Sequence, residues 1–142
     1  MKNLKNLFKK DKLTIYTSEN CSYCKQMKEK FKENNIEFVE KEIKKYENEW
    51  KNIINLTNMP VTPCIYYENQ YLFPARDFPN ADMLVQMLEN FQPDISDKKV
   101  QLLEKLKTLN YHINMAFGRL DQRLTTIESK LENNKEEKND RK

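Results

Sequence analysis

The feature that most constrains the fold is a pair of cysteines, Cys21 and Cys24, at the junction of a short apolar segment and a helix-forming run. The segment Leu13–Thr17 (LTIYT) has the character of a strand and is followed by a turn-forming SEN. After the cysteines, Met27 and Phe31 lie four residues apart, so one face of a helix can be buried while lysines and glutamates stay in water. The spacing predicts a strand, a turn and an amphipathic helix, with both cysteines at the junction.

The CxxC spacing alone leaves a redox pair, half of a zinc site and two inert thiols open. Zinc needs two more ligands, which would have to be Cys64 and His112, and His112 falls in a separate helical tail. For a redox pair, Cys21 at the helix start faces unpaired N–H groups and the positive end of the helix dipole, and Lys25 adds positive charge. Cys21 is then the attacking thiol, and Cys24, one turn further on, resolves the mixed disulfide.

The elements that follow complete the order βαβαββα. The second strand, the second helix, a pair of strands and the third helix are expected at residues 36–43, 46–58, 61–73 and 81–91. Glu68 and Asn69 form the turn between the paired strands, and Asn80 is a good cap for the third helix.

This order resembles the glutaredoxin branch of the thioredoxin fold over about residues 13–91. CSYC at the first strand–helix junction and VTPCIYY at the third strand carry the resemblance. It implies an α/β fold with a mixed four-stranded sheet and a dithiol–disulfide oxidoreductase acting on protein disulfides, including those mixed with glutathione. It also implies a cis bond before Pro63 that leaves the backbone of Thr62 open to substrate. The catalytic residues are predicted to be Cys21 and Cys24, and the substrate-binding residues Tyr23, Lys25, Thr62, Pro63 and Asp82.

The sequence departs from the family where glutathione is held. Ser18 stands where glutaredoxins usually place a basic residue, and the Gly-Gly turn before the last helix is replaced by RDFPNAD, in which Arg76 is a candidate for the lost charge. Ser22 is similar to the residue of glutaredoxins that bridge an iron–sulfur cluster, but that cluster needs glutathione as co-ligand. We therefore expect that the protein requires no cofactor and binds neither a metal ion nor a cluster. Glutathione is a candidate electron donor that we expect to bind weakly, so a thioredoxin-type partner is the preferred donor.

The C-terminal part has a different pattern. Residues 92–99, with Pro93, read as a linker, and residues 100–133 carry apolar side chains at steps of three and four, with one extra four at Ile113 to Phe117. This pattern is typical of a long helix that forms a coiled coil with a stutter. The stripe consists of Leu106, Leu109, Ile113, Phe117, Leu120, Leu124, Ile127 and Leu131. Residues 1–12 are predicted to be a basic arm, residues 13–91 the domain, and residues 134–142 a disordered tail.

Composition narrows the function classes. The 25 basic and 22 acidic residues are interspersed, which argues against nucleic acid, and no run approaches the ~20 apolar residues of a membrane span. Three cysteines, one left over, fit a reducing, cytoplasmic compartment. Two hypotheses remain: an oxidoreductase that self-associates, or joins another helix, through its tail; or an assembly component of a larger complex, such as a virion or organellar particle, with a glutaredoxin-like head.

Overall fold

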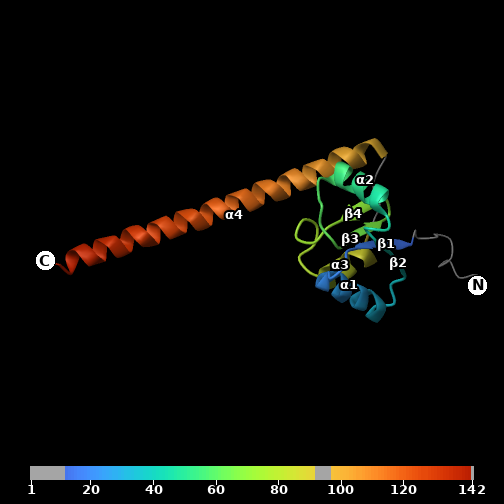
Figure 1. The fold of residues 1–142 in the computed structure, drawn as a ribbon, viewed down its shortest axis with the longest axis horizontal. Coiled ribbons are helices and arrows are strands. Elements are labelled where there is room, and N and C mark those ends of the chain that lie inside the picture. Colours follow the sequence, from blue (N-terminus) through green and yellow to red (C-terminus); the bar gives the residue numbers. More distant parts are fainter. Residues whose placement is uncertain (1–11, 92–96, 142) are drawn as a thin grey trace, which may run out of the picture. The chain divides into compact units, whose positions relative to one another are not determined.

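A computed structural model of the chain describes residues 12–91 and 97–141 (Figure 1). The predicted arm, apart from Lys12, and residues 92–96 of the predicted linker lie outside the described residues. The elements follow the predicted order, with a long helix at the end. They are β1 (Leu13–Thr17), α1 (Ser22–Glu33), β2 (Phe38–Glu42), α2 (Glu47–Thr57), β3 (Cys64–Tyr67), β4 (Gln70–Leu72), α3 (Ala81–Glu89) and α4 (Asp97–Asn139).

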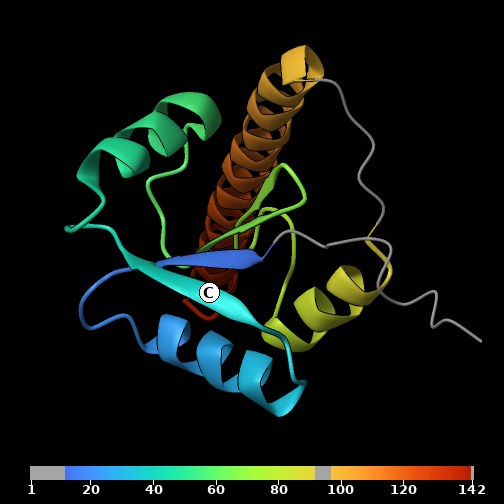
Figure 2. The same cartoon turned by 90° about the vertical axis from the view of Figure 1, so that its right-hand side faces the viewer.

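The four strands form one mixed sheet in the order β2-β1-β3-β4. β1 is parallel to β2 and antiparallel to β3, and β3 and β4 form a hairpin. The hairpin turns at Glu68 and Asn69, whose φ angles of 45° and 64° match the left-handed backbone that two-residue hairpin loops favour. In Figure 2, α1 and α3 lie on one side of the sheet and α2 on the other. The predicted thioredoxin-like fold is confirmed.

The core between the sheet and α1 and α3 fixes the position of α1. Ile15 of β1 and Ile65 of β3 are paired in register, and both side chains are fully buried. Met27 and Phe31 of α1 and Leu84 of α3 pack in the same cluster with no exposed surface. Burial of a side chain of this size contributes about 1.5–3 kcal/mol, so these contacts hold α1 firmly against the sheet.

The first turns of α4 also belong to the packed domain. Val100, Glu104 and Thr108, which share one helix face at steps of four, are buried, and Thr108 donates a hydrogen bond to the carbonyl of Thr57 in α2. The first compact unit accordingly ends at Thr108. This corrects the sequence analysis, which ended the domain at residue 91 and its linker at 99. The stripe of apolar residues in the sequence gives no sign of this contact, because Glu104 and Thr108 are polar and lie on a different face of the helix.

A buried ion pair joins α4 to the loop after β4. The side chains of Arg76 and Glu104 are each 1% exposed, and Arg76 Nη2 lies 2.7 Å from Glu104 Oε2. Arg76 Nη2 also lies 2.8 Å from the Asp77 carboxylate and donates to the carbonyl of Tyr71, while Nη1 donates to the Thr108 hydroxyl. Glu104 Oε2 accepts no hydrogen bond of regular geometry from the described residues, and the charge of Glu104 is balanced by Arg76 and by Lys107, whose Nζ lies 3.4 Å from Oε1.

The second compact unit, Leu109–Lys142, consists of the rest of α4. The helix reaches Asn139, which corrects the expected disorder from residue 134, because the Lys- and Glu-rich run that lacks apolar anchors is still composed largely of good helix formers. The side chains of the predicted stripe are all exposed, from 43% at Ile113 to 67% at Phe117. No helix in the described part of the chain is long and apolar enough to cross a membrane.

We predict that Glu104→Ala destabilises the domain by about 1–3 kcal/mol, because it removes one of the two carboxylates that balance the buried Arg76 guanidinium and leaves only Asp77. Alanine is the best helix former, so a loss of helix propensity does not contribute. Urea unfolding should show the loss, while Lys105→Ala, on the exposed side of the same turn, should stay within about 0.5 kcal/mol of the parent. Equal stabilities for the two variants would contradict a structural role for the pair.

Candidate active site

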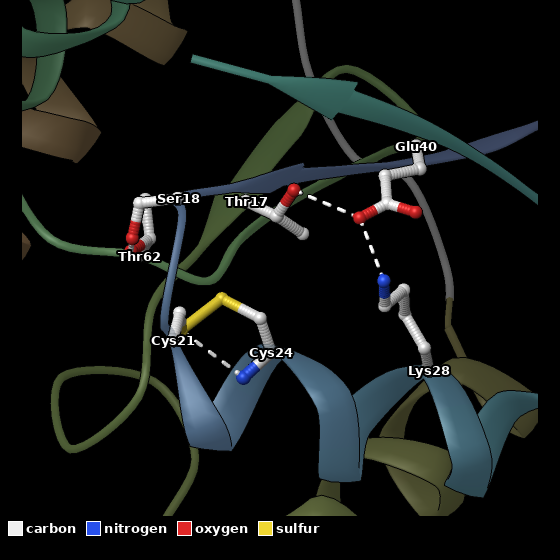
Figure 3. Close-up of a disulfide and its surroundings, with 7 residues drawn as sticks. All are labelled: Thr17, Ser18, Cys21, Cys24, Lys28, Glu40 and Thr62. Carbon is white, nitrogen blue, oxygen red and sulfur yellow. Dashed lines mark hydrogen bonds and ion pairs between the residues drawn. A yellow bond between two sulfur atoms is a disulfide. The ribbon is translucent and has the colours of Figure 1, made fainter. Parts of the chain in front are cut away.

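Cys21 and Cys24 lie at the start of α1 and are joined by a disulfide, with their Cα atoms 5.2 Å apart (Figure 3). Cys21 is the N-cap residue with an extended backbone, and its sulfur accepts a hydrogen bond from the backbone N–H of Cys24 at 3.1 Å. A sulfur in this position faces the N–H groups that the first helical turn leaves unpaired. The same interactions favour a thiolate at Cys21 once the disulfide is reduced.

The two cysteines differ in exposure. Cys24 is 2% exposed, whereas Cys21 is partly exposed at the domain surface. An incoming disulfide can therefore reach Cys21 but not Cys24. The roles expected from the sequence, in which Cys21 attacks and Cys24 resolves, stay predictions.

The segment before β3 lies next to the disulfide. The Ser18 hydroxyl, just beyond β1, is 2.7 Å from the hydroxyl of Thr62, and Figure 3 shows both beside Cys21. The Thr62–Pro63 peptide bond is cis, as the resemblance implied, and Pro63 is buried. The structure thus brings Thr62 and Pro63, two of the predicted substrate-binding residues, to the cysteines.

Tyr23 and Lys25 are both in the first turn of α1, in different environments. Tyr23 is partly buried and packs against the core cluster, and burial raises the pKa of its hydroxyl. Lys25 is exposed. Their roles in binding stay predictions.

The two charged groups considered for glutathione are engaged elsewhere. Asp82 pairs at 2.7 Å with Lys30, which lies in the last turn of α1, whereas the cysteines lie at its start. Arg76 is buried against Asp77 and Glu104, so it cannot supply the charge that Ser18 lacks. The suggestion that Arg76 replaces the lost positive charge is therefore wrong, because the buried carboxylates of Asp77 and Glu104 hold its guanidinium.

A polar cluster near the disulfide escaped the sequence analysis. Glu40 of β2 accepts from the Thr17 hydroxyl at 2.9 Å and pairs with Lys28 of α1 at 2.7 Å (Figure 3). The hydrogen bond from Lys28 lowers the pKa of Glu40, so this carboxylate stays ionised at neutral pH. No local sequence pattern indicates this cluster, because its members come from three elements and meet only when α1 packs on the parallel β1–β2 pair.

The third cysteine has no part in the site. Cys64 is unpaired and fully buried in β3, and burial raises the pKa of its thiol well above the usual value. His112, the other residue considered for zinc, is exposed on α4. Within the described part of the chain, no three side chains of His, Cys, Asp or Glu gather as a metal site.

Residues 13–72 match the family model described as Glutaredoxin. The residues from the start of β1 to the end of β4 are therefore glutaredoxin-like. Together with the bonded cysteine pair, this match supports a role of the thiol–disulfide oxidoreductase type. Among solved structures, the chain is similar to glutaredoxin grx-1 from Archaeoglobus fulgidus, at 15% identity and a TM-score of 0.45, over 62% of this chain and 96% of the archaeal one. No significantly similar sequence is found among curated proteins.

We predict that the three thiols of the reduced protein differ widely in alkylation. Cys21 should react first, with a midpoint below the free-thiol pKa of ~8.5, because the helix start favours its thiolate. Cys64 should stay unmodified at and above that pH, because its raised pKa keeps it protonated and its burial excludes the reagent. Iodoacetamide labelling followed by peptide mass spectrometry measures all three, and unfolding in urea should make them equally reactive. Faster labelling of Cys24 or Cys64 than of Cys21 would reverse the assigned roles.

Proposed function

We propose that the protein is a dithiol–disulfide oxidoreductase that acts on disulfides of other proteins through Cys21 and Cys24. The observation that carries the proposal is the asymmetric pair at the start of α1, where a partly exposed sulfur is bonded to a buried one. An extended substrate segment would dock beside the backbone of Thr62, which precedes the cis bond to Pro63 and whose hydroxyl lies 2.7 Å from that of Ser18.

The reaction needs only the chain's own thiols. The Cys21 thiolate attacks one sulfur of a substrate disulfide, forming a mixed disulfide and releasing the other substrate sulfur as a thiolate, which takes up a proton. The Cys24 thiolate then attacks the Cys21 sulfur, the substrate leaves as a dithiol, and Cys21 and Cys24 remain as the disulfide seen in Figure 3. The substrate gains two electrons and two protons, and the protein loses them. The reverse sequence forms disulfides.

A second reductant must restore the dithiol, and a thioredoxin-type dithiol protein suits the site better than glutathione. Ser18 offers a hydroxyl where a cation would bind a glutathione carboxylate. Asp82 is paired with Lys30, and Arg76 is enclosed by the domain. A reducing, cytoplasmic compartment accords with the need for this reductant and with the unpaired Cys64.

Self-association through α4 is the second half of the proposal. A row of exposed apolar side chains along the helix is an aggregation hazard unless another helix covers it. The same row also favours an alternative, in which the glutaredoxin domain serves as the head of an assembly component in a larger particle. Loss of thiol exchange in all assays, with assembly retained, would favour the alternative.

Cys24→Ser should accumulate mixed disulfides with protein substrates, because the resolving thiol is gone, whereas Cys21→Ser should trap none. The matched control is Cys64→Ser, whose buried side chain takes no part in exchange. Non-reducing gels of each variant after incubation with an oxidised protein substrate give the measurement. Equal trapping by the Cys21 and Cys24 variants would contradict the mechanism.

Ser18→Lys should raise turnover in a glutathione-coupled assay, by about tenfold if the new cation gains one carboxylate contact worth about 1–1.5 kcal/mol. Ser22→Lys is the control, since it places the same charge on the exposed first turn of α1. A rise in turnover for both variants would indicate that any added positive charge near Cys21 favours its thiolate, with no specific contact to glutathione. Efficient turnover by the unmodified protein would show that Ser18 does not limit glutathione use.

A further inference from the structure

The apolar stripe on the second unit is bordered by charges of opposite sign. Between Phe117 and Glu132 of α4, basic side chains follow one edge of the stripe and acidic side chains follow the other, and all are exposed. The basic edge consists of Arg119, Arg123 and Lys130. The acidic edge consists of Asp121, Glu128 and Glu132.

The heptad positions locate these charges. The stripe residues that occupy positions a and d beyond the stutter are Phe117, Leu120, Leu124, Ile127 and Leu131. With this assignment, Arg123 and Lys130 fall at position g, and Asp121 and Glu128 fall at position e. Side chains at e and g flank the seam of a coiled coil, where their charges set the orientation of the partner helix.

We propose that the partner on this surface is a second copy of the chain, bound parallel and in register, with Arg123 of each copy paired to Glu128 of the other. This inference rests on the proposed self-association and adds its geometry. In a parallel coil, a g residue faces the e residue five positions later on the other helix. Arg123 and Glu128 have this separation, so the two-fold arrangement forms the pair twice.

An antiparallel arrangement fits the same surface less well. It sets g against g and e against e, so the basic edge of one helix lies along the basic edge of the other. In an antiparallel pair, the stutter at Ile113 to Phe117 of one helix does not lie beside the stutter of the other helix. A parallel pair in register aligns the two stutters, so both helices unwind locally at the same level. The parallel pair does place Lys130 opposite Lys135 of the second copy, but Lys135 lies beyond the last stripe residue, where exposed charges are screened by water.

The parallel order has a consequence for function. The N-terminal ends of both helices lie at one end of the coil, so the two glutaredoxin domains that precede them in sequence leave from the same end. A substrate protein with more than one disulfide could then engage two sites without leaving the assembly.

Charge variants of the full-length protein test the ion pair by sedimentation equilibrium. Arg123→Glu and Glu128→Lys should each raise the dissociation constant about tenfold at low salt, because each turns two attractions into two repulsions. The double variant should restore the parent value, and Gln122→Glu, on the outward face of the helix, should leave it unchanged. The differences should shrink in 1 M salt. Failure of the double variant to recover would overturn the Arg123–Glu128 pairing.

Cysteine cross-linking tests the orientation, in protein whose Cys21 and Cys24 are replaced by Ser. Leu120→Cys and Leu131→Cys should each form a disulfide with the same residue of the other copy under mild oxidation, as peptide mass spectrometry would show. Ser129→Cys, which points outward, should not. Cross-links found only between positions 120 and 131 in a mixture of the two variants would overturn the parallel order but keep self-association. An oligomer that forms no cross-link at either seam position would overturn the proposed seam. A monomer at every concentration would overturn the proposed self-association itself.

Discussion

The packing of α1 against β1 and β3 is the contact on which the chemistry depends. Met27 and Phe31 are fully buried against Ile15 and Ile65, and this contact fixes where α1 begins. The helix start in turn places Cys21 at the N-cap and buries Cys24 one turn later. The difference between an accessible sulfur and a protected one is therefore a product of the hydrophobic core.

The loop between β4 and α3 has a structural role in this chain. Its arginine, Arg76, is buried with Asp77 and Glu104, and it anchors the first turns of α4 to the domain. A guanidinium held by two carboxylates cannot also bind a glutathione carboxylate. The chain thus combines a bonded cysteine pair with an arginine that is enclosed by the domain, and this combination is the basis for proposing a protein reductant.

The two halves of α4 differ in how their residues are used. Before Thr108, one helix face packs on the domain through Val100, Glu104 and Thr108. After it, the side chains are exposed except for the half-buried Tyr111, and the apolar stripe has opposite charges on its two edges. The first half depends on contacts within the chain, and the second has the composition of a helix that pairs with another helix.

The sequence by itself determined the element order, the cysteine pair and the apolar stripe, because these follow from local periodicity and spacing, and its resemblance to glutaredoxins implied the fold. It also identified Asn80 as a cap and Glu68–Asn69 as a turn, since both depend on neighbouring residues alone. Only the tertiary structure decided that Glu104 is buried, that Arg76 is unavailable and that Glu40 meets Lys28 near the disulfide. Each of these joins residues from different elements, and whether a charged side chain lies in water or against a counter-charge depends on how those elements pack.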